Sequence, residues 1–149
     1  MILGSIFLGF VLMELRMLYL YIAPRNLSKK ELILWEKDGE FVKVYGYDVF
    51  VQILGEYESP DSTVVLLHGF AESSHIFRFI LDDLAEKFSC VLAIDFIGFG
   101  LSDKPGDLKY NISMHVGTVM KVLGEKEIRG CHFYAHGMGD AVLCELISR

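Results

Sequence analysis

The sequence contains few residues of the kinds that build disulfide frameworks, zinc sites or nucleic-acid surfaces. Its three cysteines, Cys90, Cys131 and Cys144, are odd in number and far apart, which excludes a disulfide framework and a C-x-x-C metal pattern. Only 14 of its 149 residues are lysine or arginine, against 20 acidic residues, and the basic residues are scattered. Because nucleic-acid binders need a basic face to neutralise phosphates, we exclude nucleic acid as a partner.

Apolar residues are abundant, at 52% of the chain, and they are concentrated at the N-terminus. Residues 1–23 are almost entirely apolar, and about 20 such residues suffice for a helix to cross a bilayer. Glu14 and Arg16 interrupt the run and would be costly at the bilayer centre unless the helix is shifted toward one interface. We interpret the run as an uncleaved membrane anchor or an interfacial helix. Two alternatives stay open: a cleaved signal peptide, although basic leader and cleavage site are missing, and a buried amphipathic helix.

The sequence predicts three parts. Pro24 ends the apolar run and opens a linker over residues 24–37. Basic residues follow the run and none precedes it, so the positive-inside rule favours a cytoplasmic location for this flank. The three parts are an anchor at 1–23, the linker, and a folded domain at 38–149.

From residue 40 the hydrophobic pattern is typical of strands and then of alternating strands and helices. The runs 41–45 and 48–53 flank Gly46-Tyr47 and predict a hairpin. Three later runs are short and apolar without alternation, as in strands buried on both faces. Those strands are predicted at 64–67, 91–94 and 132–135, and amphipathic helices at 76–88, at 112–123 with Gly124 as C-cap, and from about Gly139.

This order of elements predicts an α/β fold with a mostly parallel, doubly wound sheet. The sequence stops at Arg149, inside the last predicted helix, with the preceding strand expected at an open sheet edge. We interpret the chain as a fragment or a truncated product.

Three loops follow the predicted parallel strands, at the edge where open α/β sheets bind ligands. In the first loop, His68 and Gly69 follow a strand directly, and the turn can direct backbone N–H groups into a cavity, where they could hold an oxyanion. An ordinary strand-to-helix turn, with Ser73 or Ser74 as helix N-cap, explains this loop equally well.

The second loop begins at Asp95 and turns at Gly98 and Gly100, where glycine permits a tight path. A third glycine and an immediately following helix are missing, so we exclude a dinucleotide-binding fingerprint.

The third loop, 135–139, has the pattern of a nucleophile elbow, with small residues at Ala135 and Gly139 on a strand–turn–helix. Its central position, where a nucleophile would stand, is Gly137, which has no side chain. Asp140 lies in the first turn of the helix, and we interpret it as stabilising the helix dipole rather than as a displaced nucleophile.

Together the loops resemble those of the α/β-hydrolase superfamily. More closely, residues 64–149 resemble the mesoderm-specific transcript protein family, which is similar to epoxide hydrolases and haloalkane dehalogenases. The residues that carry the resemblance are Val64-Val65-Leu66-Leu67-His68-Gly69-Phe70, Asp95-Phe96-Ile97-Gly98-Phe99-Gly100, Ser102-Asp103-Lys104-Pro105, Gly139-Asp140 and Glu145-Leu146. The resemblance implies the N-terminal part of an α/β-hydrolase fold, and an apolar N-terminal segment associated with the endoplasmic reticulum membrane.

The resemblance also implies roles. Gly137 occupies the nucleophile position, where an aspartate is expected, and the backbone N–H groups of Phe70 and Met138 form the oxyanion hole. His136 shapes the elbow, and the acid and the base histidine are expected beyond Arg149. Ala71 stands where many relatives have proline.

The other histidines, His75, His115 and His132, match no catalytic position and are expected in the core or in solvent. No cofactor or metal is implied, and the expected partners are membrane lipid and a small hydrophobic substrate or ligand.

Three functional hypotheses follow. The chain belongs to a membrane-anchored hydrolase that attacks an ester, epoxide or carbon–halogen bond covalently, with this chain an inactive fragment. Alternatively it is a non-catalytic pseudoenzyme that binds lipid or a protein partner, or a truncated product without independent function. Without a side chain at Gly137 covalent catalysis cannot begin at this position.

Overall fold

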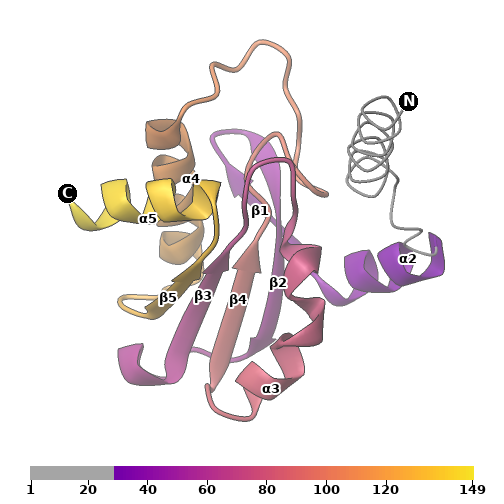
Figure 1. Cartoon of the computed structure of the whole chain (residues 1–149), viewed down its shortest axis with the longest axis vertical. Helices are drawn as coiled ribbons and strands as arrows, with labels where there is room; N and C mark the ends of the chain where they lie inside the picture. Colours follow the sequence, from indigo (N-terminus) through magenta and orange to yellow (C-terminus); the bar gives the residue numbers. More distant parts are fainter. Residues whose placement is uncertain (1–28) are drawn as a thin grey trace, which may run out of the picture. The chain divides into compact units, whose positions relative to one another are not determined.

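The computed structural model describes residues 29–149 (Figure 1). The predicted anchor lies outside the described residues. The chain divides into two compact units, Met1–Ile33 and Leu34–Arg149, and the predicted domain falls in the second. Helix α2, Lys29–Asp38, lies across this division and was not predicted, since its residues were interpreted as part of the linker. No helix among residues 29–149 is long and apolar enough to span a bilayer.

The hairpin is confirmed, with a shift in its turn. Strands β1, Glu40–Val44, and β2, Tyr47–Gly55, pair antiparallel with Val44 opposite Tyr47. The two loop residues are therefore Tyr45 and Gly46, and the predicted Gly46-Tyr47 turn is wrong. Both loop residues have positive φ, 53° and 88°, as a two-residue turn that follows the twist of the strands requires.

The central strands are confirmed as β3, Thr63–Leu67, β4, Cys90–Ile94, and β5, His132–Ala135. The sheet order is β1-β2-β4-β3-β5, with β3 parallel to both β4 and β5. The predicted α/β fold, a hairpin followed by parallel strands, is confirmed; because β2 pairs antiparallel with β4, the sheet as a whole is mixed. The carboxyl ends of β3, β4 and β5 lie at one edge of the sheet, so their three loops start close together.

Two predicted helix boundaries are wrong. Residues 76–88 do not form one helix: a 3-10 helix η2, Ser74–Phe79, is followed by a short α3, Leu81–Ala85. Helix α4, Ile112–Glu125, runs through Gly124, and its C-cap is Lys126, followed by Glu127 at φ 55°. The left-handed residue that ends the helix is thus a glutamate, and Gly124 is an ordinary helical residue. Helix α5 is Met138–Ile147, and a further 3-10 turn, η1, is Pro60–Ser62.

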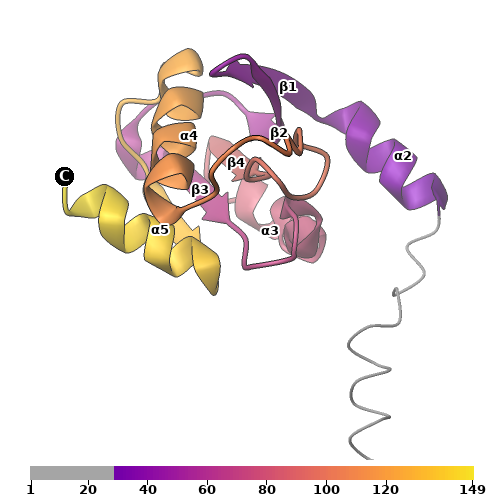
Figure 2. The same ribbon diagram turned by 90° about the horizontal axis from the view of Figure 1, so that it is seen from above.

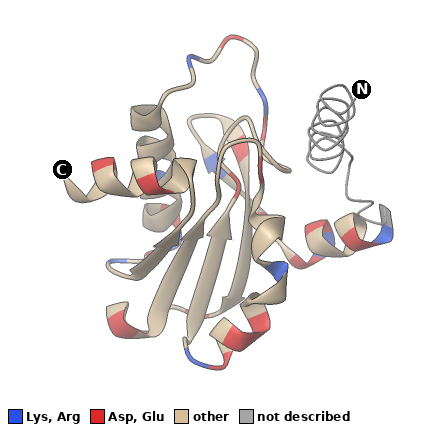
Figure 3. Cartoon of the chain, in the orientation of Figure 1, with Lys and Arg blue, Asp and Glu red and all other residues tan. Residues whose placement is uncertain are grey.

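Helix α4 lies over one face of the sheet and α3 over the other (Figure 2). Apolar residues line both faces, which explains why the strands show no alternation. On one face Leu67 and Ile94 belong to a core that includes Val116 and Val119 of α4 and Val142 of α5. On the other face the core includes Val64, Leu66, Val91 and Ala93 of the strands, with Phe77 and Leu81 of η2 and α3. Neither β3 nor β4 contains a charged residue (Figure 3).

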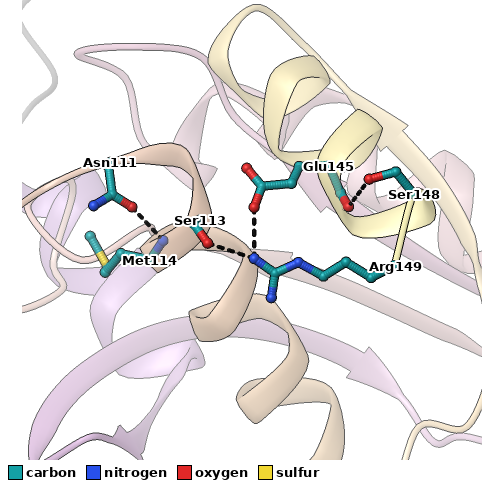
Figure 4. A network of polar contacts seen from close by, with 6 residues as sticks. All are labelled: Asn111, Ser113, Met114, Glu145, Ser148 and Arg149. Atoms are coloured by element: carbon teal, nitrogen blue, oxygen red, sulfur yellow. Dashed lines mark hydrogen bonds and ion pairs between the residues drawn. The ribbon is translucent and has the colours of Figure 1, made fainter.

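Polar contacts fix the start of α4 and join it to the end of α5 (Figure 4). The Oδ1 atom of Asn111 accepts the N–H of Met114 at 2.8 Å, an N-cap that satisfies a free donor of the first turn. The guanidinium of Arg149 donates to Ser113 at 2.5 Å and to Glu145 at 2.6 Å. The bond from Arg149 to Ser113 links the end of α5 to α4, and both helices cover the same face of the sheet.

Candidate active site

The three loops meet at the carboxyl ends of the parallel strands. The N–H of His136, in the elbow, donates to the carbonyl of Leu67 at 3.0 Å, and the N–H of Phe96 donates to Nε2 of His68 at 3.1 Å. A Cβ built on Gly137 would lie 3.4 Å from Cα of Gly69. The structure therefore brings together the loops that the sequence predicted to form one site.

The elbow has a positive-φ backbone at its centre, which glycine adopts freely. Gly137 has φ 58° and ψ −113°, and α5 begins at the next residue. A side-chain-bearing residue adopts this conformation only at an energetic cost, which is typical of nucleophile positions on a sharp strand-to-helix turn. The backbone is thus that of a nucleophile elbow, although the nucleophile is missing.

The two glycines of the elbow differ in the space around them. A Cβ at Gly139 would overlap the carbonyl oxygen of Leu67 and lie 3.0 Å from that of His68, both of them backbone atoms. At Gly137 the nearest heavy atom, Cα of Gly69, is at ordinary contact distance. Glycine at 139 lets α5 approach β3, whereas a Cβ atom at position 137 would meet its neighbour at an ordinary contact distance.

The predicted oxyanion-hole donors, the N–H groups of Phe70 and Met138, donate no hydrogen bond to other residues within 29–149. Met138 is the first residue of α5, where an N–H has no partner inside the helix and carries the positive end of the helix dipole. Two such donors are what an oxyanion hole requires. Their role in binding an oxygen stays a prediction.

His68 is buried and both of its ring nitrogens are in use. Its Nε2 accepts the N–H of Phe96, so the proton is on Nδ1, which donates to the carbonyl of Gly69 at 2.7 Å. Burial lowers its pKa, against the opposing effect of the Gly69 carbonyl. His68 is therefore a neutral structural residue that holds the first loop against the second, with no ring nitrogen left for proton transfer.

Asp95 joins the same two loops through its carboxylate. It accepts the N–H of Ser74 at 2.5 Å and that of Leu101 at 2.7 Å, while its backbone carbonyl accepts the Ser102 hydroxyl at 2.7 Å. A Cβ at Gly100 would overlap this carboxylate, and one at Gly98, φ 95°, would lie 2.6 Å from the Tyr110 ring. The two predicted loop glycines thus make room for Asp95 and Tyr110.

Glu72 is a site residue that the sequence did not single out. Its carboxylate accepts the N–H of Gly69 at 2.9 Å and lies 3.6 Å from Nε2 of His136. It thereby fixes the first loop and contacts the elbow. In the sequence Glu72 is one acid among 20, and only the fold reveals that His136 lies beside it.

An aromatic cluster lines the first and second loops. The ring of Phe70, 73% exposed, packs edge-on against Phe99 at 5.7 Å between ring centroids, and Phe99 contacts His68 and His115.

His115 is buried as expected, and its Nδ1 has no hydrogen-bond partner among the described residues. Burial, together with the nearby His68, lowers the pKa of His115 to about 4. His75 is likewise buried, and His132 is exposed.

Residues 62–145, more than half of the chain, match a family model described as alpha/beta hydrolase fold. The chain is 37% identical over 144 residues to the mesoderm-specific transcript protein of Mus musculus, covering 95% of this chain and 42% of that protein. It is 38% identical over 87 residues to a haloalkane dehalogenase of Mesorhizobium japonicum, covering 58% of this chain and 28% of the dehalogenase. The chain thus spans less than half the length of these relatives.

Solved structures of other proteins have the same fold as this chain. An epoxide hydrolase of Vigna radiata superposes with a TM-score of 0.65 at 27% identity, covering 72% of this chain and 33% of the other. A bacterial membrane phospholipase A superposes with a TM-score of 0.73 over 98% of this chain and 48% of the other; at 23% identity it shows the fold alone. With the family match over residues 62–145, these findings establish that the chain belongs to the α/β-hydrolase fold family.

Proposed function

We propose that this chain is a membrane-anchored, non-catalytic member of its family that binds a small hydrophobic ligand at the elbow. The observation that carries the proposal is Gly137, which has the elbow backbone and open space beside it but no side chain. Covalent hydrolysis requires a side-chain atom at this position that attacks the substrate and is released again when water hydrolyses the intermediate. Glycine supplies no such atom.

The remaining groups suit binding. The free N–H donors of Phe70 and Met138 can hold a carbonyl oxygen, and such donors keep their strength without a nucleophile. The exposed ring of Phe70 and the neighbouring Phe99 offer an apolar surface beside them. An ester or amide with a short hydrocarbon chain would satisfy both.

A second candidate is the hydrolase itself, acting on an ester, epoxide or carbon–halogen bond. It is supported by the contact distance at position 137, where a Cβ atom, the first atom of the aspartate that the resemblance leads us to expect, would overlap no neighbour. On this interpretation a longer chain supplies the acid and the histidine. Gly137 is then the one residue of the elbow that departs from the nucleophile-elbow pattern.

One experiment separates the two. The ¹H–¹⁵N spectrum of the full chain is titrated with ethyl butyrate, and release of butyrate is followed in the same sample. The proposal predicts shifts of the Phe70 and Met138 amide resonances without hydrolysis. Butyrate release by the wild-type chain above the rate in buffer would contradict it, as would unchanged amide resonances.

Membrane anchoring is tested separately. We expect the full chain, expressed in cells, to stay with the membrane pellet during alkaline carbonate extraction, because residues 1–23 are apolar. Complete release into the supernatant would rule out an inserted anchor.

A further inference from the structure

The 3-10 helix η2 has an apolar face that the core does not use. Ile76 and Phe79 are 41% and 75% exposed, and at three residues apart they share one face of a 3-10 helix; Ile80, the C-cap of η2, is 37% exposed. Phe77, on the opposite side of η2, is buried against the sheet. The exposed residues therefore lie on the side of η2 that faces away from the core.

Arg78 adds a cation to this face. Its guanidinium lies 3.8 Å from the ring centroid of Phe79 and donates to the carbonyl of His75 at 3.0 Å. Among the described residues no carboxylate forms an ion pair with it. The charged guanidinium therefore lies on an exposed aromatic ring, and a cation beside exposed apolar side chains is a combination typical of surfaces that contact lipid headgroups.

The C-terminal half of α2 contacts η2 through Trp35. Trp35 packs edge-on against His75, with 5.0 Å between ring centroids, and its neighbour Leu34 is 48% exposed. Trp35 also packs against the core on this side of the sheet, and it is the only tryptophan of the chain. We name Ile76 and Phe79, with the C-cap residue Ile80, the η2 face.

We infer that the η2 face lies in the headgroup region of the membrane that holds residues 1–23, so that the domain is docked on the bilayer rather than free on a tether. The inference rests on the proposed anchor. Five residues, 24–28, and the ten-residue helix α2 separate the apolar run from β1. Five extended residues span at most about 17 Å and ten helical residues about 15 Å, so the domain stays within roughly 30 Å of the bilayer.

This short tether is what favours lipid over other occupants. An apolar face held so close to the membrane meets the interface far more often than it meets another protein molecule. Partition of two or three large apolar side chains and an arginine then suffices to orient the domain, because the anchor has already restricted its translation.

The test uses the full chain in phosphatidylcholine–phosphatidylserine vesicles with lipids brominated in the upper acyl chain, which quench nearby indoles. The probe variant is Trp35→Phe with Phe79→Trp. The matched control is Trp35→Phe with Met120→Trp, since Met120 is 50% exposed on α4, over the other face of the sheet. We expect severalfold quenching at position 79 and none at position 120. Circular dichroism checks that both variants are folded. If the Phe79→Trp variant is unfolded, Ile76→Trp replaces it.

Flotation of the vesicles keeps the two claims apart. If the chain does not float, the proposed anchor is wrong and the docking falls with it. If the chain floats but the indole at position 79 is unquenched, or both positions are quenched alike, the anchor stands and the docked face is overturned. Protection of position 79 by a second copy or by another protein gives that same unquenched result.

Discussion

The elbow and the second loop both turn on glycines with positive φ, but these glycines do different things. In the second loop the space beside Gly100 is filled by the carboxylate of Asp95, and the space beside Gly98 by the Tyr110 ring. In the elbow the space beside Gly137 is open, and the next glycine, Gly139, is pressed against the backbone of β3. A glycine in a turn can therefore be required by its neighbours or can mark a missing functional side chain, and only the surroundings distinguish the two.

The largest effect is expected at Gly139. Gly139→Ala places a methyl group on backbone carbonyls that cannot move without breaking β3, so we predict a loss of about 3 to 5 kcal/mol in the free energy of unfolding. Urea unfolding measures it, with Gly106→Ala as control because nothing lies within 4 Å of a Cβ there. Equal stability of the two variants would mean that α5 does not approach β3 as described.

The second effect is acid destabilisation through His115. Its pKa falls from 6.5 in the unfolded chain to about 4 in the folded one, so the unfolded chain binds the proton first as pH falls. Titration of His115 leaves the free energy of unfolding unchanged above pH 6.5. Between about pH 6.5 and pH 4 this free energy falls by about 3 kcal/mol, because the unfolded chain takes up the proton first. The lowered pKa of His68 acts in the same direction.

His115→Gln should flatten this part of the stability curve, measured as urea midpoints from pH 7.5 to 4.5. His132→Gln is the control, because His132 is exposed. A wild-type curve that rises toward acid pH would contradict the burial of His115.

A smaller loss is expected at Gly137. Gly137→Ala meets no steric obstacle and suffers only from its positive φ, so we predict a loss of about 1 to 2 kcal/mol, less than for Gly139→Ala. The same urea measurement checks the ranking. A Gly137 variant that is the less stable of the two would show that the position has no room for a nucleophile.

The smallest effect, a gain, is expected at Ala71, whose φ is 58°. Ala71→Gly relieves the left-handed strain and should stabilise the chain by about 0.5 kcal/mol. Ala71→Pro should destabilise it, since the proline ring fixes φ near −65°. A stabilising proline would mean that the first loop follows another path.

The sequence predicted the strands and the three loops well because buried strands and turn glycines leave strong local patterns. It misplaced the turn at Tyr45 and the end of α4 at Glu127, because at both positions a residue other than glycine adopts positive φ. It could not find the contact between Glu72 and His136, which lie 64 positions apart and meet only through the parallel pairing of β3 with β5. The empty nucleophile position was visible in the sequence, but the room beside it was not.

The most direct test of the central claim is to supply a nucleophile at the elbow. Gly137→Cys places a thiol at the N-terminus of α5, where the helix dipole lowers thiol pKa values. The full chain and this variant are incubated with p-nitrophenyl butyrate, and the modified cysteines are mapped by mass spectrometry, with exposed Cys144 as internal reference. We predict an acyl adduct at position 137 that forms faster than at Cys144, and neither an adduct in the elbow nor catalytic turnover in the wild type. Turnover by the wild type, or a thiol at 137 no more reactive than Cys144, would contradict the account.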